Sequence, residues 1–133
     1  MPGRPTASLV FGCADNMGRL STHVLDASRG VPARGVVVDL HVLRNRERLY
    51  LTTATTNSDG RTAEPLLSGA NMKAGVYELT FHAGDYFRAM GIELSDPPFL
   101  DQVVIRFGLA DATANYHVPL LIAPYSYSTY RGS

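Results

Sequence analysis

The chain has 133 residues, which suits one domain built around a single hydrophobic core. Its 12 basic and 12 acidic residues cancel, so no net field favours nucleic acid or an anionic membrane, and no apolar run reaches membrane-spanning length. Hydrophobic residues at 45% exclude a disordered chain, and Cys13, the only cysteine, excludes an internal disulfide and suits a reducing, cytoplasmic location.

The chain opens with a segment that lacks any sustained hydrophobic period. Residues 1–20 contain Pro2, Pro5 and three glycines. Proline and glycine interrupt regular structure, and nothing in this stretch repeats with the period of a helix or a strand. The pattern predicts a flexible N-terminal lead-in over residues 1–20 and one folded domain over residues 21–133.

Three strands are predicted next along the chain. Residues 36–43 alternate apolar and mixed positions, as a half-buried strand does. Residues 49–57, "LYLTTATTN", are rich in β-branched and aromatic side chains. The sequence "NSDG" closes that strand as a turn and leaves Arg61 directly behind it. Residues 75–83, "GVYELTFHA", alternate again and predict the third strand.

One helix and two more strands complete the prediction. Residues 84–91, "GDYFRAMG", have a helix start, helical spacing and a terminal glycine, which predicts about two turns. Strands follow at 103–109 and 116–124, and Pro119 within the latter predicts an edge strand or a bulge. Several short strands, separated by turns, with one short helix indicate an all-β fold, an antiparallel sandwich of two sheets.

Few residues are candidates for chemistry. The chain lacks G-x-S-x-G, a phosphate loop, a cysteine pair and H-E-x-x-H. His23 and His117 are each either a strand histidine with a backbone partner or a catalytic base, since an imidazole titrates near neutral pH. Arg61 is either a solvated turn residue or a planar fork for a flat, carbonyl-rich ligand. The C-terminal "YSTYRGS" has two tyrosines and an arginine where chain ends usually fray, which predicts a docked terminus.

The other two histidines point to no metal site. His41 and His82 lie on predicted strands near Asp39 and Glu78, and we interpret both as solvent-side residues. The four histidines have none of the short spacings that make a ligand set, and no second cysteine joins them. The sequence therefore predicts neither a metal nor another cofactor.

Taken together, these segments resemble the transthyretin-related family, and within it the enzyme branch that hydrolyses 5-hydroxyisourate. The resemblance covers about residues 20–133. It rests on "LSTHVLDASRGVPARGVVVDLHVL", "TNSDGR", "GVYELTFHAGDYF", "PFLDQVVIRF" and "YHVPLLIAPYSYSTYRGS". The terminal "YRGS" is the most specific element, because the hormone-carrying branch lacks it. The resemblance implies a transthyretin-like sandwich of two four-stranded sheets, and a homotetramer, a dimer of dimers with active sites at the dimer–dimer interface.

The resemblance also implies the reaction: hydrolysis of 5-hydroxyisourate to 2-oxo-4-hydroxy-4-carboxy-5-ureidoimidazoline in urate degradation, without a cofactor. One histidine takes a proton from water, with His23 placed slightly ahead of His117, and the other orients the water or stabilises the oxyanion. Arg61 holds the flat ring through paired hydrogen bonds. The implied catalytic residues are His23, Arg61, His117 and Ser133. The implied substrate-binding residues are Arg61, Asn115, Tyr130, Arg131 and Gly132.

One position departs from the family pattern, and two other classes of function remain open. Asn115 stands where family members often have histidine, so no third histidine is expected to act in the pocket. A transthyretin-like carrier would use the same channel for an apolar ligand and would line it with apolar side chains. A sandwich that serves adhesion or assembly would make the combination of His23, Arg61, His117 and "YRGS" a coincidence.

Overall fold

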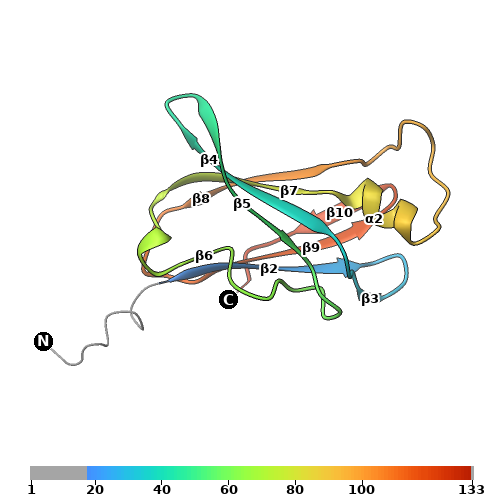
Figure 1. The fold of residues 1–133 in the computed structure, drawn as a ribbon, viewed down its shortest axis with the longest axis horizontal. Coiled ribbons are helices and arrows are strands. Elements are labelled where there is room, and N and C mark those ends of the chain that lie inside the picture. Colours follow the sequence, from blue (N-terminus) through green and yellow to red (C-terminus); the bar gives the residue numbers. More distant parts are fainter. Residues whose placement is uncertain (1–17, 133) are drawn as a thin grey trace, which may run out of the picture.

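The computed structural model describes residues 18–132, which form two β-sheets packed face to face (Figure 1). The strands are β2 (Arg19–Asp26), β3 (Val31–Pro32), β4 (Val37–Arg44), β5 (Glu47–Thr55), β6 (Leu67–Ser68), β7 (Gly75–Phe81), β8 (Val103–Leu109), β9 (Tyr116–Ala123) and β10 (Ser126–Thr129). The described helices are α2 (Ala83–Ala89) and the 3₁₀ turn η2 (Gly69–Asn71). Over residues 18–132, no helix is long and apolar enough to cross a membrane.

The predicted two-sheet sandwich is confirmed, with two differences in detail. One sheet has four antiparallel strands in the order β5-β4-β7-β8. The other has five, in the order β10-β9-β2-β3 with β6 also paired to β2, so the implied count of four is one too low. The additional pairing comes from two-residue strands, too short to show alternation in the sequence. Within this sheet β2 and β9 run parallel, whereas an antiparallel arrangement was expected.

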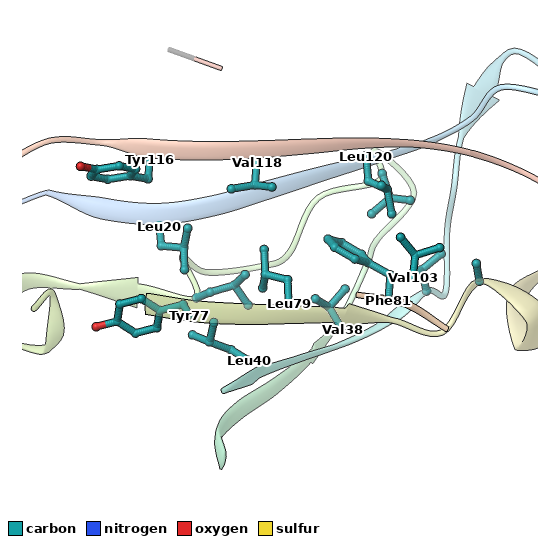
Figure 2. Close-up of a cluster of buried hydrophobic side chains, with 14 of the residues drawn as sticks. Leu20, Val38, Leu40, Tyr77, Leu79, Phe81, Val103, Tyr116, Val118 and Leu120 are labelled. Carbon is teal, nitrogen blue, oxygen red and sulfur yellow. The ribbon is translucent and has the colours of Figure 1, made fainter. Parts of the chain in front are cut away.

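The core lies between the two sheets. Val36, Val38, Leu40 and Val42 are at most 4% exposed, as the alternation of this segment predicts. Figure 2 shows side chains of β4 and β7 facing those of β2 and β9 across the core. Each fully buried side chain of this size contributes roughly 1.5–3 kcal/mol relative to exposure, so the facing layers hold the two sheets together. Leu20 belongs to this core, and residues 1–17 of the predicted lead-in lie outside the described part.

The predicted helix is confirmed as α2, which starts one residue earlier than expected. Tyr86 and Phe87 are buried against the core. Gly91 follows the helix with a φ of 80°, a left-handed conformation that glycine adopts without strain, and so ends it. Asp85 in the first turn and Arg88 in the last turn complement the helix dipole.

Pro119 does not lie on an edge strand, so the edge alternative of that prediction is wrong, and the register of β9 with β2 shows no bulge at this residue. Strand β9 lies between β10 and β2. The β9–β10 register pairs Thr129 with Leu120 and would place Tyr130 opposite Pro119. Proline has no N–H to donate there, and the regular ladder ends at Thr129. The Thr129 hydroxyl donates to the Pro119 carbonyl at 2.7 Å instead, so an interior proline is accommodated by a gap in the ladder.

His41 and His82, at the outer face of the four-stranded sheet, were expected to point to solvent, and the structure differs. Both are half-buried. His82 Nε2 lies 2.8 Å from Asp39 Oδ2, and Nδ1 of His41 is buried without a hydrogen-bond partner among the described residues. Glu78 is 6% exposed beneath two arginines, Arg48 and Arg106, which donate to its carboxylate. Long side chains from neighbouring strands therefore cover polar groups that the strand pattern alone assigns to water.

A buried carboxylate fixes the end of β2. Asp26 is 1% exposed and accepts hydrogen bonds from Ser28, Arg29 and the Tyr86 hydroxyl, the last at 2.8 Å. Burial alone would raise the pKa of Asp26, but the bonds from Ser28, Tyr86 and Arg29 outweigh it and hold this pKa below its ordinary value. The contact with Tyr86 joins the end of β2 to α2.

We expect Tyr86→Phe to lower the free energy of unfolding by about 1.5–3 kcal/mol, the usual cost of losing a hydrogen bond to a charged group. Because the pKa of Asp26 is lower in the fold than in the unfolded chain, this stabilisation is complete above its ordinary value of 3.8 and is lost as pH falls through the folded value. Urea unfolding at neutral and acidic pH measures both effects. Tyr125→Phe, at an exposed position, is the control, and equal stability of the two variants would contradict the assignment.

Candidate active site

The parallel pairing of β2 with β9 places two histidines on neighbouring strands. Ser21 is directly opposite His117. His23, two residues further along β2 and on the same face of the sheet, is opposite Pro119. Oγ of Ser21 lies 2.8 Å from Nδ1 of His117. The rings of His23 and His117 are 6.5 Å apart between centroids and are tilted by 34°. The two histidines that the sequence singled out are therefore brought together.

The turn at residues 57–61 brings Arg61 to the same place. The Asn57 side-chain oxygen accepts from the N–H groups of Asp59 and Arg61, at 2.9 and 3.2 Å, and so shapes the turn. The N–H of Val24 donates to the Gly60 carbonyl at 2.8 Å, which fastens the turn to β2. His23 and Arg61 form an isolated antiparallel bridge beside this contact.

Gly60 cannot be replaced without moving the turn. Its φ is 76°, which favours glycine. In addition, a Cβ at this position would lie 2.3 Å from the Val24 carbonyl oxygen and 3.2 Å from Cδ2 of His23. The glycine in "NSDGR" thus permits the close approach that positions both His23 and Arg61.

The C-terminal segment closes the other side of His117. The N–H of Gly132 donates to the His117 carbonyl at 2.7 Å, and the two residues form an isolated antiparallel bridge. A Cβ at Gly132 would lie 2.8 Å from Cδ2 of His117, so only glycine lets the backbone come this near the imidazole. The segment before Ser133 is therefore docked on β9, and Ser133 itself lies outside the described residues.

A groove of about 470 Å³ opens where these segments meet. The residues that line it are Arg19, Ser21, Arg61, Asn115 and His117. Two of these five are arginines and none is acidic. Partial burial, followed by the charges of Arg61 and His23, holds the pKa of His117 below its ordinary value of 6.5. The groove therefore presents a neutral imidazole beside guanidinium groups, a combination suited to proton abstraction near a developing negative charge.

The hydrogen bond of His23 determines which of its nitrogens carries a proton. Nε2 lies 2.8 Å from the carbonyl oxygen of Asp59. A carbonyl oxygen only accepts, so Nε2 carries hydrogen and, in the neutral ring, Nδ1 holds the lone pair. His117 is different because its partner is the hydroxyl of Ser21, which can accept or donate.

The remaining predicted residues divide between two places. Arg61, Asn115 and His117 line the groove. Tyr130 and Arg131 instead line a separate cavity of about 420 Å³ between β8 and the C-terminal segment. The guanidinium of Arg131 stacks over the Tyr116 ring at 4.1 Å and donates to the Asn115 carbonyl at 3.1 Å. In one chain these two side chains anchor the terminal segment, and their contact with substrate stays a prediction.

The structure adds two residues that the sequence analysis missed, Arg19 and Ser21. Arg19 fell within the predicted lead-in, although β2 begins there. Ser21 shares a strand face with His23, but a lone serine in a strand carries no signal of its own. The parallel pairing that sets it opposite His117 links residues 96 positions apart, which no local pattern reveals.

Fold and site together define a transthyretin-like β-sandwich with a basic, histidine-containing groove on its five-stranded sheet. The chain belongs to the HIUase/transthyretin family, whose model matches residues 20–132. It is 58% identical over 116 residues to 5-hydroxyisourate hydrolase 2 of Rhizobium meliloti. The aligned region covers 87% of this chain and 97% of that protein.

Solved structures agree with this assignment. The 5-hydroxyisourate hydrolase of Klebsiella pneumoniae has a TM-score of 0.73 and 40% identity, covering 88% of this chain and 100% of the other. (S)-allantoin synthase has a TM-score of 0.84 and 42% identity, covering 90% of this chain. This chain spans 45% of that longer protein, so the likeness concerns one part of it.

We expect Arg61→Gln to raise the pKa of His117, because removal of a nearby positive charge makes the imidazolium less costly. A nuclear magnetic resonance titration of the His117 ring protons in the folded protein measures this change. The matched control is Arg46→Gln in the β4–β5 turn, on the other sheet. A His117 titration midpoint that is the same in the wild type and in Arg61→Gln would contradict the proximity of the two groups.

Proposed function

We propose that this chain hydrolyses 5-hydroxyisourate to 2-oxo-4-hydroxy-4-carboxy-5-ureidoimidazoline, a reaction of urate degradation. The observation that carries the proposal is the convergence of His117, Arg61 and His23 from three separate segments. His117 and Arg61 line the groove, and His23 lies beside them, bridged to Arg61 and with its ring 6.5 Å from that of His117. Family membership and a relative named as 5-hydroxyisourate hydrolase at 58% identity support the same substrate. His23, His117 and Arg61 supply the two imidazoles and the guanidinium that the proposed reaction uses.

In the proposed reaction the neutral imidazole of His117 takes a proton from a water molecule. The water oxygen then bonds to the carbonyl carbon of the six-membered ring, and the carbonyl oxygen becomes an oxyanion. Collapse of this intermediate breaks the ring C–N bond, and the imidazolium returns its proton to the departing nitrogen. The new carboxylic acid loses a proton to solvent. The lowered pKa of His117 supports its role as the base, since this imidazole is neutral at physiological pH.

The other proposed residues, on the groove and beside it, would hold the substrate and stabilise charge. Arg61 presents a planar fork that pairs with two adjacent carbonyl groups of a flat heterocycle. His23, when protonated, keeps its bond to the Asp59 carbonyl and offers Nδ1–H to the oxyanion. Asn115 lines the groove and has both a donor and an acceptor for the ring edge. Ser133 is the fourth proposed catalytic residue, and its role is supported only by the resemblance to the family.

The lining of the groove argues against the carrier function. A carrier for an apolar ligand needs a mostly apolar pocket, whereas all five lining residues here are polar or charged. An assembly module would leave the contact between Ser21 and His117 and the lowered pKa of His117 without a purpose. Hydrolysis uses each of these features.

The proposed active form is a homotetramer, a dimer of dimers, in the cytoplasm. In one chain β8 and β10 are the terminal strands of the two sheet paths, and Tyr127 and Tyr130 near them are 45% and 61% exposed. Such edges and aromatic side chains are suited to contact with a second copy. The cytoplasmic location rests on a single cysteine, which needs no oxidising compartment.

We expect His117→Ala to lower kcat by about 10²–10⁴-fold, the usual contribution of a positioned base. Ultraviolet absorbance follows the decay of freshly generated 5-hydroxyisourate with and without enzyme, and the uncatalysed decay is the baseline. His82→Gln, at the N-cap of α2 and bonded to Asp39 of the other sheet, should keep the wild-type rate. Failure of the wild-type protein to accelerate the decay would refute the proposed function, and a fully active His117→Ala would refute the role of this base.

Deletion of Ser133, or a tag added after it, should lower kcat/KM while leaving the melting temperature nearly unchanged. The reason is that the preceding Gly132 already packs against His117, so added or missing atoms would alter the groove more than the core. The same tag at the N-terminus is the control. A C-terminally tagged protein with full activity would show that the terminus is only structural.

A further inference from the structure

The imidazole of His117 is held at two of its edges. On one edge Nδ1 lies 2.8 Å from Oγ of Ser21, on the neighbouring parallel strand. On the other edge the Gly132 backbone is so near that a Cβ there would come within 2.8 Å of Cδ2. These contacts come from both sides of β9 in the sheet, so the ring plane is fixed by its neighbours.

One ring nitrogen remains without a protein partner among residues 18–132. Nδ1 is engaged by Ser21, and no hydrogen bond of Nε2 of His117 is present in the described structure. His117 and Ser21 both line the groove. Within residues 18–132, Nε2 is therefore the atom of His117 left to bind water or substrate, provided that it carries a lone pair and not a proton.

We infer that Ser21 is a positioning residue: its hydroxyl accepts a hydrogen bond from Nδ1–H of His117 and so keeps the lone pair on Nε2. This inference rests on the proposed function and extends it to a residue outside the set matched by resemblance. In the opposite arrangement the hydroxyl donates to Nδ1, Nε2 carries hydrogen, and neither nitrogen can take a proton directly from water. A backbone carbonyl would also enforce the required tautomer, and the serine supplies a side-chain equivalent on the groove wall.

The same hydrogen bond assists the reaction after proton transfer. When Nε2 takes a proton, the ring becomes cationic, and the bond from Nδ1–H to Ser21 becomes charge-assisted and stronger. This partly offsets the repulsion from the other positive groups near the groove, which are Arg19 and Arg61 on its lining and His23 when protonated. Ser21 would therefore help most when the imidazole is charged, and its loss should change the pH dependence of the reaction.

The adjacent residue provides a matched control. Thr22 also donates across the β2–β9 ladder, from its hydroxyl to the Val118 carbonyl at 2.7 Å, but it is buried in the core. Thr22→Val removes a hydroxyl from the same pair of strands without touching the groove. It should lower stability and leave the pH profile of kcat unchanged.

The test compares Ser21→Ala, Ser21→Thr and Thr22→Val in the full-length, untagged protein. Nitrogen-15 spectra of histidine-labelled protein report the tautomer of His117 above its pKa, independently of activity, and histidine-to-glutamine variants assign the four histidines. We expect Nδ1–H in the wild type, a shift towards Nε2–H in Ser21→Ala, and recovery in Ser21→Thr. We also expect Ser21→Ala to lower kcat by about 10–100-fold, the factor that corresponds to losing a hydrogen bond to a charged group, and to displace the acidic limb of the kcat profile.

The possible failures can be told apart. Nε2–H in the wild type would overturn the inference, as would a Ser21→Ala variant with an unchanged rate and pH profile. An effect of Thr22→Val on the pH profile equal to that of Ser21→Ala would reduce Ser21 to a structural role and also overturn it. A wild-type protein without hydrolase activity refutes the proposed function, and in that case the tautomer measurement still decides whether Ser21 orders the ring.

Discussion

The parallel pairing of β2 with β9 is the constraint on which the site depends. It sets Ser21 against His117 and brings the His23 ring within 6.5 Å of the His117 ring. The turn that carries Arg61 is fastened to β2, and the terminal segment is fastened to β9. Each functional segment is thus tied by backbone hydrogen bonds to one of two adjacent strands in the middle of a sheet, where the buried face holds them rigid.

Much of the fold could be predicted because it follows from local patterns. The alternation of residues 36–43 identified β4 and its buried face, and "GDYFRAMG" identified α2. Non-local pairing was not predictable in this way. Pro119 suggested an edge, but β10 lies beside it and leaves a gap at the missing N–H. Glu78 followed an outward-facing pattern and is nevertheless buried, because Arg48 and Arg106 come from other strands.

The residues of the candidate site also fall into two groups, those that the sequence reveals by residue type and those that only tertiary pairing reveals. His23, Arg61 and His117 were found because their side chains are rare and chemically distinctive, and the resemblance added Asn115 and the terminal residues. Ser21 was missed because a serine in a strand is ordinary until its partner is known. The resemblance gave Arg131 a role as a substrate ligand, which stays a prediction, and within one chain its guanidinium stacks on Tyr116 and stabilises the docked terminus. Residue type predicts which groups can react, and tertiary pairing determines how they are oriented.

The two histidines illustrate how the same side chain acquires different properties on one sheet. His23 bonds to a backbone carbonyl, which permanently assigns the proton to Nε2. His117 bonds to a hydroxyl, lies partly buried beside Arg61 and has a lowered pKa, so it is kept neutral while its Nδ1 partner can adapt to a change of charge. His117 is therefore better suited to proton transfer, because it lines the groove and its lowered pKa keeps it neutral. His23, which does not line the groove, is better suited to holding a fixed donor or acceptor beside it.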